Sequence, residues 1–180
     1  HDDLMMAKED LEKVIKDMEE EMKVQFINSF NSINKEFNNV FSKLFNGGKA
    51  SLELEDEKDV LNCGIEIKAQ PPGRKLQTLN LLSGGEKSLT AVALLFAIMN
   101  IKPAPFCILD EIDAALDDAN IDKYAEYLKN LAKDTQFIVI THRKGTMEAA
   151  NVLYGVTMEE EGVSKVLSVK LTDALGEKAS

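Results

Sequence analysis

The segment from Leu82 to Leu89, with the sequence Leu-Ser-Gly-Gly-Glu-Lys-Ser-Leu, constrains the fold of this chain more than any other stretch. Its serine and two glycines lead into an almost wholly apolar run that ends at Met99, which predicts a loop that turns into a buried helix. The first N–H groups of such a helix have no partners within the helix and lie at the positive end of its dipole. The segment therefore predicts an anion site at Ser83, with a plain helix N-cap as the alternative.

Two short apolar runs further along the chain each end in polar residues. The run Phe106 to Leu109 ends in Asp110-Glu111, and the run Gln136 to Ile140 ends in Thr141-His142-Arg143. Both predict buried parallel strands, and open α/β sheets bind ligands at the C-terminal ends of such strands. One acid can hold Mg²⁺ through water while its neighbour accepts a proton from an attacking water. Helix caps and an ordinary loop histidine remain the alternatives for each motif taken alone.

These segments together resemble a known family. Leu82 to Leu89, Phe106 to Asp117 and Ile140 to Gly145 resemble the signature, Walker B, D-loop and switch-histidine segments of an ABC-type ATPase head. The amino-acid sequence of these segments resembles that of the C-terminal lobe of a bacterial SMC (structural maintenance of chromosomes) protein, and the resemblance extends over roughly Pro71 to Leu171. The resemblance implies an α/β fold, an ABC-type P-loop NTPase-like C-terminal lobe with a mostly parallel sheet and flanking helices, entered by an N-terminal coiled-coil helix root.

The resemblance also implies roles for single residues of the catalytic segments. Asp110 would hold the Mg²⁺ shell through water, and Glu111 would be the general base that positions the attacking water. His142 would be the switch residue that contacts the γ-phosphate of ATP. Arg143 matches the sequence motif of the family, but we expect no chemical role for it.

Further roles are implied for the signature and the D-loop, at the interface between two heads. Ser83, Gly84 and Gly85 would bind the γ-phosphate of the ATP that the opposite head holds. Asp117 falls in the D-loop, which would cross the dimer interface.

One motif that an ATPase of this kind needs is missing from the sequence. Gly-x-x-x-x-Gly-Lys-[Ser/Thr] does not occur, because Gly48-Lys49 is followed by Ala50 and a glutamate separates Gly85 from Lys87. The resemblance implies that the main ATP cradle lies in an N-terminal lobe of the same SMC protein, and that two heads pair as a homodimer around ATP and Mg²⁺. The fragment alone is therefore expected to be inactive as an ATPase.

An apolar stripe precedes these motifs. Its members recur every three or four positions, which predicts one long helix: Leu11, Ile15, Met18, Met22, Phe26, Phe30, Ile33, Phe37, Val40 and Leu44. Charged residues crowd the first half, as in a coiled-coil strand, whereas the Phe-rich second half is expected to dock on a domain. Gly47-Gly48 is expected to end the helix as a C-cap, and a plain core helix is the alternative.

The remaining pattern completes a lobe with strands and helices. Strands are expected at Ser51 to Glu55, Gly64 to Ala69, Leu153 to Met158 and Val163 to Leu171, and helices at Ile121 to Leu131 and Thr146 to Ala150, with Asp117 and Asp118 as caps of the first helix. We expect three parts: a coiled-coil root at 1–46, the lobe at 47–171 and a frayed tail at 172–180.

Composition narrows the classes of function. A hydrophobic content of 44% argues against disorder. The net charge of −10 gives the chain no overall electrostatic attraction to nucleic acid. Two cysteines, Cys63 and Cys107, suit a reduced compartment, with Cys107 expected to be buried. The chain begins with His1 inside a charged helix pattern, which indicates a piece of something longer, and no run resembles a signal peptide or a membrane span.

The resemblance implies that the chain is the C-terminal half of an SMC ATPase head, cytoplasmic and nucleoid-associated, which acts in chromosome condensation and segregation. The implied partners are the N-terminal lobe, a second SMC head, a kleisin subunit and DNA in the full complex, with no membrane. The alternatives are a head of a related DNA-repair ATPase, a transporter nucleotide-binding domain, or a non-catalytic kleisin-docking module.

Overall fold

The computed structural model of the chain describes residues 2–170. The predicted tail at 172–180 and the last residue of the predicted strand ending at Leu171 lie outside the described residues. The described chain divides into two compact units. The first unit comprises the residues up to Ser83 and Thr90–Lys102, and the second comprises Gly84–Leu89 and the residues from Pro103 onward. The predicted domain boundaries at 46/47 and 171/172 stay a prediction.

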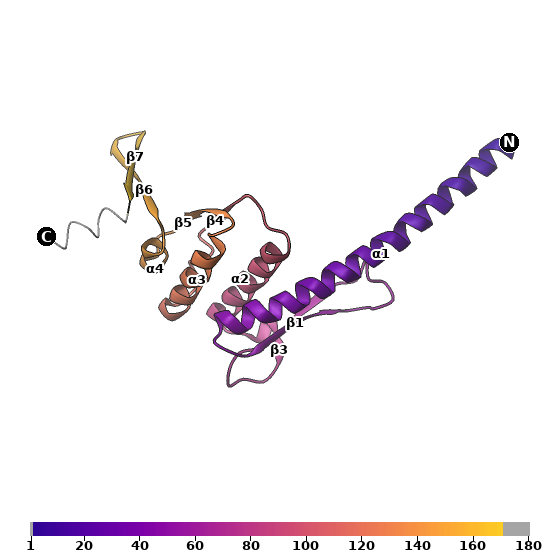
Figure 1. Cartoon of the computed structure of the whole chain (residues 1–180), viewed down its shortest axis with the longest axis horizontal. Helices are drawn as coiled ribbons and strands as arrows, with labels where there is room; N and C mark the ends of the chain where they lie inside the picture. Colours follow the sequence, from indigo (N-terminus) through magenta and orange to yellow (C-terminus); the bar gives the residue numbers. More distant parts are fainter. Residues whose placement is uncertain (1, 171–180) are drawn as a thin grey trace. The chain divides into compact units, whose positions relative to one another are not determined.

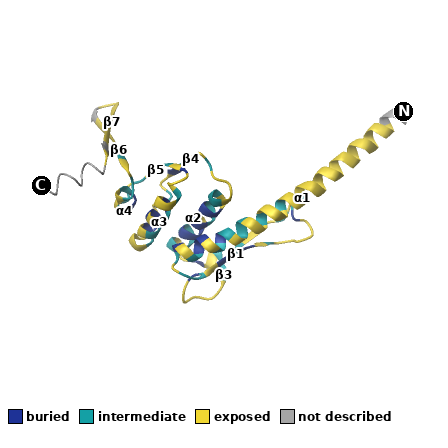
Figure 2. Ribbon diagram, viewed as in Figure 1, coloured by how far each residue is buried: buried dark blue, intermediate teal, exposed yellow. Residues whose placement is uncertain are grey.

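The first unit begins with helix α1 (Asp2–Leu44), drawn in indigo to purple in Figure 1. The apolar stripe of α1 is exposed in its first half, where Leu11 is 63% and Met18 is 58% accessible. In its second half Phe37 and Val40 are fully buried. Figure 2 shows the change along α1 from an exposed N-terminal part to a partly buried C-terminal part. The predicted helix is confirmed, and so is docking of its Phe-rich half, whereas its pairing in a coiled coil stays a prediction.

The end of α1 follows the geometry of a Schellman cap. The N–H of Gly47 donates to the carbonyl of Ser42 at 2.8 Å and the N–H of Asn46 to that of Lys43 at 3.3 Å. The residue in the left-handed conformation is Asn46, with φ 55°. The predicted Gly47-Gly48 cap is therefore wrong by one residue, because asparagine also tolerates this conformation at the C′ position.

A three-stranded antiparallel sheet packs with α1 in the first unit. Its strands are β1 (Lys49–Leu54), β2 (Ile65–Gln70) and β3 (Gln77–Thr78), in the order β1-β2-β3, followed by the short helix η1 (Leu79–Leu81). Two side chains of α1 bond the backbone of edge strand β1. Asn34 accepts from the N–H of Leu52 and donates to its carbonyl, at 2.8 and 3.0 Å, and Asn38 accepts from the N–H of Ala50 at 3.1 Å. These contacts cover an edge that would otherwise offer free backbone groups.

The second unit contains the predicted strand–helix–strand arrangement. Strand β4 (Phe106–Asp110) pairs in parallel with β5 (Gln136–Ile140), and helix α3 (Asp118–Leu131) connects them. Ile121, Tyr124 and Leu128 form the buried face of α3, as their spacing predicts. The parallel βαβ prediction is confirmed.

Two expectations about the sheets are wrong. A mostly parallel sheet was expected, yet β4–β5 is the only parallel pair among residues 2–170. Buried strands were expected too, yet Phe106 and Ile108 are each 57% exposed, and Cys107 is only half-buried. The physical reason is that the residues described here leave one face of the β4–β5 pair uncovered, and local sequence cannot report what covers a face.

The second unit ends with a short helix and a hairpin. Helix α4 (Lys144–Glu148) begins two residues before its predicted start, and the predicted strands appear as β6 (Val152–Glu160) and β7 (Val163–Lys170). The two strands pair antiparallel, and Gly162 takes φ 82° in their turn. None of the helices in the described part of the chain has the length and apolar content needed to cross a membrane.

Candidate functional site

The signature segment forms the start of helix α2 (Gly84–Ile101), as predicted. Ser83 stands directly before the helix and is exposed. A Cβ placed on Gly84 would meet nothing within 4 Å, and one placed on Gly85 would lie 3.8 Å from the carbonyl of Ala115 and 3.9 Å from Oδ2 of Asp117. The structure therefore brings Gly85 of the signature next to Asp117 of the D-loop, within the second unit.

The structure also brings the predicted catalytic residues to one edge of the β4–β5 pair. Asp110 pairs with Ile140 in register, and the N–H of Glu111 donates to the carbonyl of Ile140 at 2.9 Å. His142 follows two residues after β5 ends, and its Nδ1 lies 3.6 Å from Oε1 of Glu111. The side chains of His142 and Glu111 are 62% and 59% exposed, so both are accessible to a ligand.

Glu111 has an unusual backbone conformation. Its φ is 48°, in the left-handed region that residues other than glycine, asparagine and aspartate rarely occupy. Strain of this kind persists where the surrounding structure fixes it, and it is common at active sites. The chain bends at Glu111, directly after β4, and the Glu111 carboxylate lies 3.6 Å from the imidazole of His142.

Asp117 is the N-cap of α3, as predicted, whereas Asp118, also predicted as a cap, is the first residue of the helix. Its Oδ1 accepts from the N–H of Asn120 at 2.8 Å at the start of α3. Its Oδ2 lies on the side of Gly85. Capping fixes the position of this carboxylate, and its role in a dimer interface stays a prediction.

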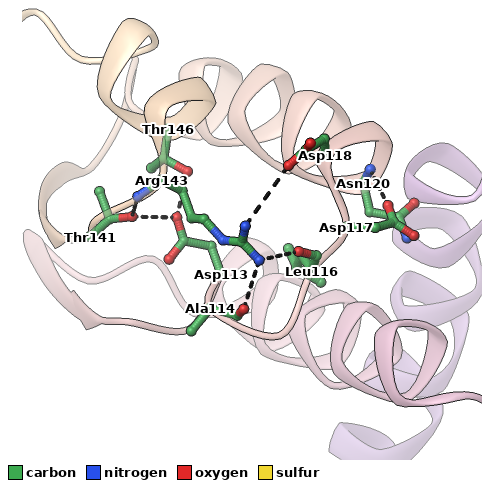
Figure 3. Close-up of polar contacts among 9 residues, drawn as sticks. All are labelled: Asp113, Ala114, Leu116, Asp117, Asp118, Asn120, Thr141, Arg143 and Thr146. Atoms are coloured by element: carbon green, nitrogen blue, oxygen red, sulfur yellow. Dashed lines mark hydrogen bonds and ion pairs between the residues drawn. The ribbon is translucent and has the colours of Figure 1, made fainter.

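A second set of polar contacts surrounds Asp113, two residues after Glu111 (Figure 3). Asp113 is only 1% exposed, and its Oδ2 accepts from the hydroxyls of Thr141, at 2.7 Å, and Thr146. The hydroxyl oxygen of Thr141 also accepts from the N–H of Arg143 at 2.9 Å. We call Asp113, Thr141, Arg143 and Thr146 the Asp113 cluster.

The guanidinium of Arg143 extends this cluster to the D-loop. Its Nη2 donates to the carbonyls of Ala114 and Leu116, at 2.8 and 2.7 Å, and its Nη1 lies 3.9 Å from Oδ1 of Asp118 (Figure 3). From the sequence alone, no role was expected for Arg143, and Asp113 was not singled out. A third acid two residues after the Asp-Glu pair, and threonines on both sides of His142, are the signals that could have pointed to them.

The residues fit Mg²⁺ only together with a nucleotide. Among residues 2–170 no group of three or more His, Cys, Asp or Glu side chains is placed to hold a metal ion. Asp110 and Glu111 supply two neighbouring carboxylates at the strand end. Because Mg²⁺ is usually held by one or two carboxylates, waters and substrate phosphates, this pair suits an ion that arrives with ATP.

The profile of one protein family, RecF/RecN/SMC N terminal domain, matches residues 3–165 of the chain. The chain belongs to this family. The chromosome partition protein Smc of Bacillus subtilis (strain 168) is 60% identical over 172 residues, which are 96% of this chain and 14% of that protein. The Smc of Clostridium kluyveri (strain NBRC 12016) is 59% identical over 170 residues, 94% of this chain and 14% of that protein. The chain thus spans 14% of the length of these relatives.

Solved structures of SMC heads have the same fold. An Smc head domain with an extended coiled coil from Pyrococcus furiosus, bound to the C-terminal domain of ScpA, has a TM-score of 0.81 and 44% identity, over 95% of this chain and 43% of that one. A structure concerned with ATP-driven dimerization and DNA-stimulated activation of SMC ATPases has a TM-score of 0.77 and 43% identity, over 88% of this chain and 98% of that one. The fold, with mixed helices and sheets, is that of SMC ATPase heads.

Proposed function

We propose that this chain is the C-terminal half of an SMC ATPase head, and that ATP hydrolysis by the completed head drives chromosome condensation and segregation at the nucleoid. The observation that carries the proposal is the placement of Glu111 and His142 3.6 Å apart beside Asp110, at the C-terminal end of a parallel strand pair. Open α/β sheets bind their ligands at this edge. The similarity to Smc proteins favours this function over that of a transporter domain or a DNA-repair ATPase.

Each residue has a distinct role in this proposal. Asp110 would hold Mg²⁺ through water, and the chemistry that the ion would supply there is neutralisation of phosphate charge. Glu111 orients the attacking water and takes its proton, and His142 contacts the γ-phosphate. The start of α2, with Ser83 and Gly84-Gly85, binds the γ-phosphate held by the opposite head through its N–H groups.

The uncovered face of the β4–β5 pair supports completion by an N-terminal lobe. Phe106 and Ile108 of β4 and Ile138 and Ile140 of β5 lie on this face, and their exposed fractions run from 48% to 57%. Within the described residues each strand has only one neighbour. Contiguous apolar surface of this kind marks a site where another segment packs, and the sequence contains no Walker A motif.

The proposal is tested with Glu111→Gln in the head completed by its N-terminal lobe. Glutamine keeps the shape of the side chain but removes its basicity, so we expect kcat to fall about 10²- to 10⁴-fold while ATP-bound dimers accumulate. Glu126→Gln, an exposed change on α3, is the matched control and should leave kcat unchanged. Turnover is measured by phosphate release and dimers by size-exclusion chromatography. Ordinary turnover in Glu111→Gln, or in the isolated chain, would contradict the proposal.

Docking of a kleisin subunit is a second candidate function, and it can coexist with the first. Two solved SMC heads are bound to ScpA, one to its C-terminal domain and the other to its C-winged helix domain. In this chain the β6–β7 hairpin exposes Tyr154 (70%), Val156 (71%) and Val166 (65%), a surface suited to an apolar partner. We expect Tyr154→Ser to weaken capture of a ScpA-type C-terminal domain and Glu111→Gln to leave it intact. If both variants captured the domain equally well, the β6–β7 hairpin would not be the docking surface.

A further inference from the structure

We propose that the Asp113 cluster positions His142 and couples it to the D-loop, so that a shift of the D-loop changes hydrolysis. This inference rests on the proposed ATPase function. The residues of the cluster do not touch the phosphates in this account. They act through the backbone on both sides of His142.

Both neighbours of His142 in the sequence are anchored by hydrogen bonds. Thr141, before it, donates its hydroxyl to Asp113, and Arg143, after it, donates its N–H back to the Thr141 hydroxyl. Thr146, in α4, donates to the same Asp113 oxygen. The backbone that carries the switch histidine is therefore tied to a single carboxylate in the loop after β4.

The switch segment also contacts the D-loop directly, through Arg143. Arg143 bonds the carbonyls of Ala114 and Leu116, the two residues on either side of Ala115. The loop continues into Asp117, which caps α3 and lies beside Gly85 of the signature. A displacement of this loop by an opposing head would reach the backbone of His142 through one guanidinium. Rigid chains of hydrogen bonds are a physical route for such coupling.

Fold stability alone does not account for the Asp113 cluster. The Oδ1 of Asp113 and the Nε of Arg143 are both buried, and neither has a hydrogen-bond partner within the described part of the chain. A buried, partly satisfied carboxylate destabilises a fold relative to apolar residues of the same size. Such a group is retained where it fixes a geometry, and here the geometry it fixes is that of the segment around His142.

The test is Thr146→Val in the completed head, with Thr146→Ser as the conservative variant. Valine keeps the shape of threonine but cannot donate to Asp113, whereas serine can. We expect Thr146→Val to lower kcat about 10- to 100-fold, in line with the cost of a small misplacement of a catalytic group, with KM for ATP changed less than about threefold. Thr146→Ser should restore most of kcat. Thr141→Val is the second variant, in case Thr146→Val does not fold.

Thr135→Val is the matched control. Thr135 is also a buried threonine of the second unit, 7% exposed, and its hydroxyl donates to the carbonyl of Ala104 at 3.0 Å, outside the cluster. Its loss should lower thermal stability but leave kcat within about twofold of wild type, because a merely structural hydroxyl does not position His142. An equal fall of kcat in Thr135→Val and Thr146→Val would overturn the proposal, and so would wild-type kcat in Thr146→Val.

A readout without ATP separates this inference from the proposed function. Amide hydrogen exchange of residues 113–118 should quicken in Thr146→Val and not in Thr135→Val. If the wild-type head neither binds nor hydrolyses ATP, the proposed function fails, whereas the exchange contrast still shows whether the two segments are coupled. Unchanged exchange at 113–118 in Thr146→Val would overturn the coupling.

Discussion

Two polar networks, one in each unit, join segments that are far apart in the sequence, and they differ in chemistry. In the first unit Asn34 and Asn38 of α1 bond the backbone of β1 with neutral amides. In the second unit the Asp113 cluster uses a carboxylate and a guanidinium to tie the switch segment to the D-loop. The first network covers a strand edge, and the second surrounds residues proposed to act on ATP.

The two networks also differ in how completely they are satisfied. The amide of Asn34 both accepts and donates, whereas an oxygen of Asp113 and a nitrogen of Arg143 are buried without partners among the described residues. Among residues 2–170 each unit has one residue other than glycine with positive φ, Asn46 and Glu111, and only the asparagine suits that conformation. The difference indicates that the network of the first unit favours stability and that the Asp113 cluster gives up stability for geometry.

The largest expected effect on stability is in the first unit. Asn34→Ala removes two bonds and leaves the N–H and carbonyl of Leu52 without partners, so we expect unfolding free energy to fall by about 2–3 kcal/mol. The kcat of the completed head should stay within about twofold of wild type. Asn39→Ala, on an exposed position of the same helix, is the control and should cost about 0.5 kcal/mol or less. If Asn34→Ala kept its stability but lost most of its kcat, the network of the first unit would act in function and not in stability, and the contrast with the Asp113 cluster would fail.

The next effect concerns the core beside the Asp113 cluster at alkaline pH. Burial, and then the charges of Asp113 and Cys107, raise the pKa of Tyr124 well above its usual range. The unfolded phenol loses its proton near pH 10 while the folded one keeps it, so stability should fall as pH rises above about 10, by up to about 1.4 kcal/mol per pH unit.

Tyr124→Phe should reduce the decrease of unfolding free energy with rising pH. Denaturant unfolding between pH 8 and 11 measures this dependence. Tyr154→Phe, at an exposed position of the hairpin, is the control and should leave the slope of wild type. Equal slopes for wild type and Tyr124→Phe would show that burial of this phenol does not govern alkaline stability.

The parts of the fold that sequence could predict are those set by local pattern. The spacing of apolar residues predicted α1 and α3, and the glycines before an apolar run predicted the start of α2. The acids after β4 and the histidine after β5 were predicted to lie at one edge, and Glu111 and His142 do lie together there. Parallel pairing was enough to bring them to the same edge.

The parts that sequence could not predict depend on distant residues. The contacts of Asp113 with Thr141 and Thr146 join positions 28 and 33 residues apart, which no periodicity reports. The exposure of Phe106 could not be read from an apolar run either, because such a run shows hydrophobicity and not what covers it. For the same reason the sequence could not show that Arg143 contacts the D-loop.

A smaller effect tests the strain at Glu111. Replacement by glycine removes the cost of the left-handed conformation, and replacement by alanine keeps it. We therefore expect Glu111→Gly to be more stable than Glu111→Ala by about 1 kcal/mol, the reverse of the order at most positions. Thermal unfolding of the two variants measures the difference, and both should be inactive. An Ala variant as stable as the Gly variant would show that the backbone at this position is relaxed.

The smallest effect tests the matching position in the first unit. Asn46 takes φ 55° at the C′ position of α1, where glycine is the preferred residue and asparagine is tolerated. Asn46→Gly should therefore raise unfolding free energy by only a few tenths of a kcal/mol, since little strain is present to relieve. Asn31→Gly, in the interior of α1, is the control and should lower it by a similar amount. The gain in unfolding free energy from Asn46→Gly should be smaller than the difference between Glu111→Gly and Glu111→Ala. If the two values were equal, the backbone strain at Asn46 would be as large as that at Glu111, and the contrast between the two units would fail.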